Sequence, residues 1–88
     1  MRLDKFLKAA GIVRRRTVAN DLATAGRIYI DERVAKPSAE IRAGCRIRID
    51  FGRKIATYEV LDVPLREPRR DEAERYVRLL DERIREDW

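Results

Sequence analysis

RIYIDERVAK, residues 27–36, is the stretch at which the pattern of apolar residues changes. Ile28 and Ile30 alternate, Asp31-Glu32 can form a turn, and Val34 resumes the apolar pattern. A period of two on either side of a short polar turn predicts a β-hairpin. The residues before this stretch have helical spacing and those after it alternate. The hairpin therefore divides a helical part of the chain from a β part.

Two short helices are predicted before the hairpin. Leu3, Phe6, Leu7 and Ala10 fall at i, i+3, i+4 and i+7, and Gly11 closes this first helix. A second helix is predicted over about 15–25, with Gly26 ending it. Its apolar residues are expected to face inward: Val18, Ala19, Leu22, Ala23 and Ala25. With a short connection between them, the two helices form a compact pair.

The second half of the chain predicts more strands and one further helix. CRIRIDF (45–51) alternates as a half-buried strand, and IATYEVLDV (55–63) is a second strand that Pro64 ends. From Asp71 onward, apolar residues recur at helical spacing, with the acid–base pairs Asp71–Arg75, Glu74–Arg78 and Asp81–Arg85 at i,i+4. The predicted fold class is α+β, with one domain over residues 1–66. Residues 67–88 are predicted to be a charged amphipathic helix that packs on this domain or meets a protein partner.

Composition excludes several classes of function. The chain has 88 residues, which allows a single small core that buries about 60% of the surface of the unfolded chain. It has no histidine and a single cysteine, Cys45, so neither a His-based nucleophile pair nor a zinc site is expected. We predict a protein that is not an enzyme and needs no metal or cofactor. No apolar run approaches a membrane span or a signal peptide, so a cytoplasmic location is expected.

The net charge of +5 is unevenly distributed. Residues 1–27 hold seven Lys and Arg against two acids, whereas residues 67–88 hold six against eight. A basic excess at one end of the sequence is expected when one face of the protein binds a polyanion.

Arg14, Arg15 and Arg16 stand together at the predicted start of the second helix. A helix N-terminus carries about half a positive charge, so folding gains nothing from three cations there. A bound phosphate would be favoured by the backbone amides, the helix dipole and the guanidinium groups together. Thr17 could cap the helix or reach the same phosphate. The alternative is a solvated basic turn in a chain that uses Arg far more than Lys, 17 against 4.

These residues lie within a pattern that resembles the S4-type RNA-binding domain. The resemblance covers about residues 1–50 and rests on RLDKFL (2–7), Arg16 with Ala19, Leu22, Gly26, IYIDERVAKPS (28–38) and IRAGCRIRI (41–49). It implies the αL motif, in which two helices pack beside a small antiparallel sheet. Asp31-Glu32 replaces the Asn-Gly turn that is common in this family.

The resemblance also implies which residues bind RNA. The family's RNA face is the N-terminal end of the second helix with adjoining residues, and it identifies Asp4 and Arg16 as functionally sensitive. Asp4 could serve as a first-turn acid or could orient nearby arginines. Carried over to this sequence, the RNA-binding residues are Arg2, Lys5, Arg14, Arg15, Arg16, Thr17, Arg27 and Lys36.

The whole chain is similar to the small S4 proteins of bacterial ribosome-associated quality control. This resemblance implies a monomer that binds the large ribosomal subunit with peptidyl-tRNA, contacts ribosomal RNA and tRNA, and supports alanine-tail addition by an RqcH-type factor. A heat-shock S4 protein is the alternative, although the negative tail favours quality control. A DNA-binding module is disfavoured because Asn20 is the only Asn or Gln available for base readout.

Overall fold

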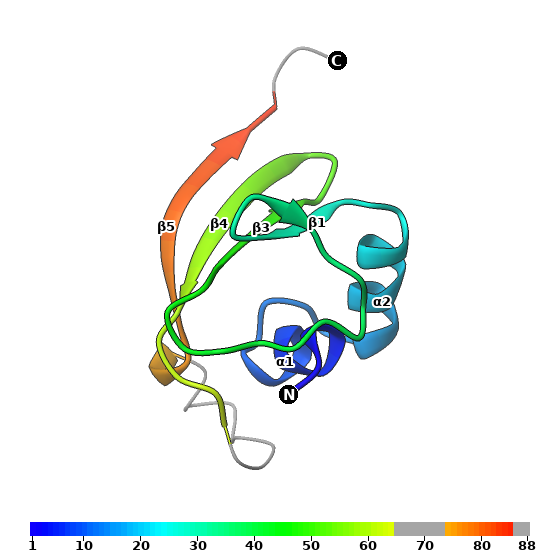
Figure 1. Ribbon diagram of the computed structural model, residues 1–88. Coiled ribbons are helices and arrows are strands. Elements are labelled where there is room, and N and C mark those ends of the chain that lie inside the picture. The colour runs from blue at the N-terminus through cyan, green and yellow to red at the C-terminus, as the bar shows by residue number, and fades with distance from the viewer. Residues whose placement is uncertain (65–73, 86–88) are drawn as a thin grey trace.

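The computed structural model describes residues 1–64 and 74–85. In these residues, helices α1 (Leu3–Ala9) and α2 (Arg16–Thr24) precede the strands β1 (Ile28–Ile30), β2 (Arg33–Val34), β3 (Arg46–Asp50), β4 (Lys54–Val60) and β5 (Val77–Ile84). The strands form one antiparallel sheet in the order β2-β1-β3-β4-β5, and both helices lie on the same side of it (Figure 1). The predicted α+β class is confirmed. Neither described helix is long and apolar enough to cross a membrane.

The core forms between the apolar stripe of α1 and the inner face of the sheet. Leu3, Phe6 and Leu7 have no exposed surface, and neither do Ile47 and Ile49 of β3. Burial of one such side chain contributes about 1.5–3 kcal/mol to folding. Gly11, with φ 73°, ends α1 as predicted, because a residue with a side chain is disfavoured in this left-handed conformation.

Helix α2 buries a narrower stripe than its sequence predicts. Ala19 and Ala23, one turn apart, are buried, and Leu22 is half-buried. Val18 is 44% exposed and Ala25 is also exposed, so the prediction that these two face inward is wrong. Small residues at i and i+4 let α2 approach its neighbours closely, and the rest of its surface remains available to solvent.

The hairpin predicted over residues 28–34 is present, with Asp31 and Glu32 at its turn. Both residues have positive φ, 48° and 71°, as a two-residue turn of type I′ requires. The Asp31 carboxylate accepts a hydrogen bond from the Arg46 amide at 3.0 Å. The side chain of Glu32 is 80% exposed, and within the described residues its one ion-pair partner is Arg48. The hydrogen bond to the Asp31 side chain thus offsets part of the backbone strain at that residue. The exposed ion pair of Glu32 offsets little of the strain at Glu32.

Replacing Glu32 by Gly is expected to stabilise the protein by about 0.5–1 kcal/mol. The left-handed conformation costs a residue with a side chain about 1–2 kcal/mol, and the greater freedom of Gly in the unfolded chain offsets part of that gain. Urea unfolding measures the change. Asp31→Gly is the matched control and should give no gain, because it also removes the bond to the Arg46 amide. A destabilised Glu32→Gly variant would contradict the account.

The predicted C-terminal helix is wrong, because residues 77–84 form strand β5. This strand pairs with β4 along its whole length, from Lys54↔Ile84 to Val60↔Val77. The register shifts between Thr57, which pairs with Asp81, and Tyr58, which pairs with Leu79. Leu80 is therefore an extra residue in β5 without a partner in β4. The bulge interrupts the alternation of β5, so that its apolar residues imitate a helical period.

The ion pairs of this segment differ accordingly from the predicted i,i+4 pairs. Arg78 pairs with Glu59 of β4 at 2.6 Å, not with Glu74. Arg85 pairs with Asp50 of β3 at 3.0 Å, not with Asp81. The predicted Asp71–Arg75 pair and the domain boundary at residue 66 lie outside the described residues. Strand β5 itself belongs to the same sheet as β1–β4.

Candidate nucleic-acid interface

The carboxylate of Asp4 stands between two arginines from different elements. Arg2, just before α1, donates from Nε and Nη2 to the two carboxylate oxygens, each at 3.2 Å. Arg16, the first residue of α2, places Nε 3.4 Å from Oδ1. Asp4 is 2% exposed, while the side chains of Arg2 and Arg16 are 49% and 47% exposed. One buried acid therefore holds two guanidinium groups that remain half open to solvent.

Asp4 is the one residue with a charged side chain in the buried core of the described chain. Burial by itself raises the pKa of Asp4, but hydrogen bonds from Arg2, the Lys5 amide, Asn20 and Arg16 outweigh this effect and lower the pKa below its ordinary value. The carboxylate is therefore ionised at neutral pH. Two arginines share this single negative charge, which leaves the group one unit positive.

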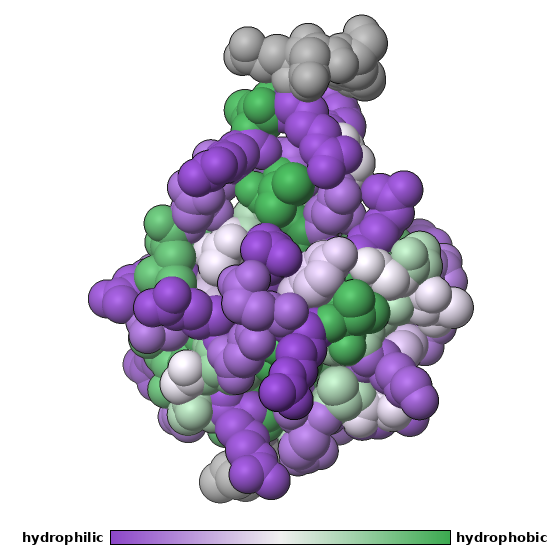
Figure 2. Space-filling model, turned by 45° about the horizontal axis from the view of Figure 1, so that its top comes forward, coloured by the Kyte–Doolittle hydropathy of each residue, from purple (hydrophilic) through white to green (hydrophobic). Residues whose placement is uncertain are grey.

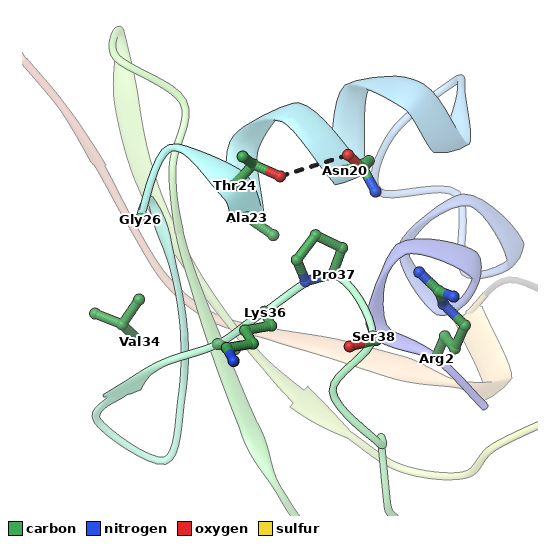
Figure 3. A pocket seen from close by; sticks show the side chains of 10 residues that line it. Arg2, Asn20, Ala23, Thr24, Gly26, Val34, Lys36, Pro37 and Ser38 are labelled. Atoms are coloured by element: carbon green, nitrogen blue, oxygen red, sulfur yellow. Dashed lines mark hydrogen bonds between the residues drawn. The ribbon is translucent and has the colours of Figure 1, made fainter.

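The loop after β2 is fixed against this group through the first amides of α1. The Leu3 amide donates to the Ala39 carbonyl at 2.8 Å, and the Asp4 amide donates to the Pro37 carbonyl at 3.1 Å. These bonds satisfy helix donors that have no partner within the helix. They also bring Lys36 and Ser38 to the same side of the molecule as Arg2 (Figure 3).

The other predicted cations of this region are exposed. In residues 1–64 and 74–85, Lys5, Arg14 and Arg15 form no ion pair. Thr17 is exposed and does not cap α2, since the N-cap residue is Arg15 and no side chain caps the helix. The first amides of α2 thus lie beside Arg14, Arg15 and Arg16, where the helix dipole also favours an anion.

Arg27 is the predicted site residue that the structure places elsewhere. It follows the C-terminal end of α2, and its Nη1 lies 3.8 Å from Asp50 of β3, which also pairs with Arg85. Figure 3 shows the neighbouring Gly26 at the end of α2 away from Arg2. The structure therefore brings together Arg2, Asp4 and Arg16, with Lys5, Arg14, Arg15, Thr17 and Lys36 around them, and leaves Arg27 apart.

Asn20 is the main residue that the sequence did not identify as part of this group. It lies one turn after Arg16, contributes to lowering the pKa of Asp4, and accepts a hydrogen bond from Thr24 at 3.4 Å. Residues 16, 20 and 24 form a polar stripe at i,i+4 spacing, and this signal was available in the sequence. The approach of Ser38 and Pro37 depends on the loop path, which local spacing does not reveal.

The arginines on the outer side of the sheet are mostly paired with acids. Arg48 pairs with Glu32, Arg78 with Glu59, Arg83 with Asp81, and Arg85 with Asp50. Residues 1–27, which include both helices, hold seven Lys and Arg against two acids, so most of the net positive charge lies in the helical part of the chain. Figure 2 shows a face on which hydrophilic side chains predominate and apolar residues form separate small patches, a surface better suited to a polar partner than to an apolar one.

Known proteins resemble this chain in sequence. The family model for the S4 domain matches residues 1–47. The RQC P-site tRNA stabilizing factor of Bacillus subtilis is 36% identical over 86 residues, covering 98% of this chain and all of that protein.

Two solved structures share the fold. The trimeric heat shock protein 15 of Vibrio cholerae superposes with a TM-score of 0.82 at 26% identity, over 91% of this chain and 81% of that one. The solution structure of hypothetical protein HP1423 superposes with a TM-score of 0.79 at 32% identity, over 92% of this chain and 98% of that one. This chain therefore belongs to the S4-domain family and, by its likeness over nearly its whole length, to the RQC P-site tRNA stabilizing factors.

Proposed function

We propose that this protein binds the large ribosomal subunit carrying peptidyl-tRNA and contacts both ribosomal RNA and tRNA, without catalysis of its own. The observation that carries the proposal is the buried Asp4, which holds Arg2 and Arg16 in place while half of each side chain stays exposed. The name of the relatives, RQC P-site tRNA stabilizing factor, supports the same class of binding partner. Binding would hold the tRNA in place while an RqcH-type factor adds the alanine tail.

The geometry suits phosphate recognition for a specific reason. A guanidinium group presents five donors in a plane and binds phosphate through two of them at once. Arg2 uses Nε and Nη2 for Asp4, so its remaining donors point away from the acid in a fixed plane. Because the side chain is already ordered, binding loses less conformational entropy than it would with a free arginine. Arg14, Arg15 and Lys5 add charge around this fixed pair.

The remaining parts of the proposal follow from the same interface. We infer that residues 1–66 form the RNA-binding unit, that the chain acts as a cytoplasmic monomer on the ribosome, and that β5 completes the sheet. Arg27 pairs with Asp50, so its role would be secondary to that of Arg2 and Arg16. Folded RNA is recognised mainly by its shape, its phosphates and its unpaired bases. A small rigid domain with a basic end fits a junction between two RNA segments.

A second candidate is the function of a heat-shock-type S4 protein that binds stalled large subunits. The fold likeness to heat shock protein 15 favours it. The net charge of residues 67–88, six basic against eight acidic residues, argues against a second RNA contact there. Both candidates place the chain on the large subunit, and they differ in whether the tailing reaction depends on it.

Large subunits with peptidyl-tRNA are expected to retain the protein in sedimentation, whereas vacant large subunits should retain clearly less. The reason is that the proposed interface contacts two RNAs, so removal of one loses part of the phosphate contacts. The measurement is the bound fraction at a fixed, physiological salt concentration, with small subunits as the control. Adding the protein should also lengthen alanine tails made by an RqcH-type factor. Equal retention on small and large subunits would contradict the proposal.

A further inference from the structure

A shallow pocket adjoins the Asp4 group, between α2 and the loop that follows β2 (Figure 3). Its volume is about 490 Å³. Ala23, Val34, Ala35 and Pro37 give it an apolar floor, and polar side chains stand at its rim. Val34 is 61% exposed, because no other described residue covers this side of the short strand β2. The pocket thus combines exposed apolar surface with the most basic part of the molecule.

We propose that this pocket receives an unpaired nucleobase of the RNA that the chain binds. The proposal rests on the proposed function and goes beyond it by naming the part of the RNA that enters. An extrahelical base has an apolar face, which the alkyl and proline groups of the floor would cover. Its edge carries hydrogen-bonding groups, which need partners at the rim. The pocket supplies both surfaces in one place.

The rim supplies hydrogen-bonding groups whose positions are partly fixed. Asn20 accepts a hydrogen bond from Thr24 at 3.4 Å, which helps to orient its amide before any ligand arrives. Ser38 and Lys36 form no side-chain hydrogen bond or ion pair within the described residues, and both line the pocket. These donors can therefore be offered to the edge of a base without breaking an existing contact.

The charges around the pocket distinguish an RNA occupant from a protein one. Arg2 and Lys36 line it from separate segments, and none of the ten lining residues is an acid. The hollow on the outer side of the sheet differs, because Asp50 and Asp81 line it together with arginines. A nucleotide chain that places a base in the pocket would set its flanking phosphates near two cations. Charge complementarity therefore favours a polynucleotide.

The test compares three RNA hairpins that share one stem: fully paired, with a single bulged nucleotide, and with an abasic residue at the bulge. The parent protein should bind the bulged hairpin about fivefold to tenfold more tightly than the abasic one, because an abasic residue buries no base against the apolar floor. Thr24→Leu places a branched apolar group at the rim and should abolish this preference. Ala25→Leu changes an exposed residue directly after α2 that does not line the pocket, and it should retain the preference.

The outcomes separate this inference from the proposed function. If all three hairpins bind equally to the parent, the base pocket is wrong while RNA binding stands. If none of them binds and large subunits are not retained either, the proposed function fails as well. If Thr24→Leu weakens retention on large subunits without changing the hairpin preference, the pocket holds a protein segment and the inference is overturned. Circular dichroism of both variants confirms that they remain folded.

Discussion

Replacing Arg16 by alanine is expected to weaken binding to large subunits by about tenfold to a hundredfold. A hydrogen bond between charged groups contributes about 1.5–3 kcal/mol, and 1.4 kcal/mol corresponds to a factor of ten. Arg16 stands at the start of α2, where its guanidinium and the helix amides would meet the same phosphate. Removing one phosphate contact should also make the plot of log affinity against log salt shallower by about one unit.

The stability of the Arg16→Ala variant should change little. The side chain is 47% exposed, and Asp4 keeps its bonds from Arg2 and the Lys5 amide. Urea unfolding should therefore differ by less than about 1 kcal/mol from the parent. Arg53→Ala is the matched control: it removes the same charge from the turn between β3 and β4, at the end of the sheet away from α1 (Figure 1). Equal losses of affinity in the two variants would mean that charge alone, and not position, determines binding.

Replacing Asp4 by asparagine is expected to lower the free energy of unfolding by about 1.5–3 kcal/mol at pH 7. The substitution keeps the size of the side chain and removes the charge that Arg2 and Arg16 share. The pKa of Asp4 is lowered in the folded protein, so its ionised form is favoured by folding. That contribution is complete above the unfolded pKa of about 3.9 and is lost as the pH falls through the folded value. The gap between parent and variant should therefore narrow in acid.

Urea unfolding at pH 7, 5, 4 and 3 measures this gap. Asp21→Asn is the control, because Asp21 is an exposed acid of α2 and the substitution makes the same change in net charge. At every pH, the free energy of unfolding of Asp21→Asn should stay close to that of the parent. A difference between Asp4→Asn and the parent that stays the same at every pH would show that the ion pairs contribute nothing and that only local packing has changed.

RNA binding by Asp4→Asn distinguishes positioning from simple charge. The variant gains one unit of positive charge, so long-range attraction alone predicts tighter binding to RNA. If Asp4 aligns the two guanidinium groups, their loss of orientation should instead weaken binding about fivefold to thirtyfold, or about 1–2 kcal/mol. Tighter binding by the variant would mean that Asp4 stabilises the fold but does not orient the two arginines for RNA.

The sequence predicts the first part of the fold because the signals there are local. Helices α1 and α2, the hairpin of β1 and β2, and strands β3 and β4 each have a period or a turn within a few residues. Strand β5 has no such signal. Its pairing with β4 joins residues that are 17 positions apart at Val60↔Val77 and 30 at Lys54↔Ile84, and the bulge at Leu80 hides the alternation. The spacing of its apolar residues therefore predicts a helix, whereas in the structure the segment pairs with the open edge of β4.

In the candidate interface, too, the sequence predicts local features better than contacts between distant residues. Arg2, Asp4 and Arg16 can be suspected from charge and from a family resemblance, and the structure shows them in contact. The pairing of Arg27 with Asp50 is invisible in the sequence, because 23 positions separate the two residues and the sheet brings them together. Lys36 joins the group only through the carbonyls of Pro37 and Ala39, which cap α1. Contacts that depend on tertiary packing are the ones that local patterns miss.

The matched charges on the outer side of the sheet have a practical consequence for preparing the protein. Ion pairs at an exposed surface contribute little to folding, and the core beneath them is apolar. At about 1 M salt the Debye length shrinks to about 3 Å, so the attraction to phosphates is lost while the apolar core stays intact. A wash in concentrated salt should then strip co-purifying nucleic acid from the chain and leave it native.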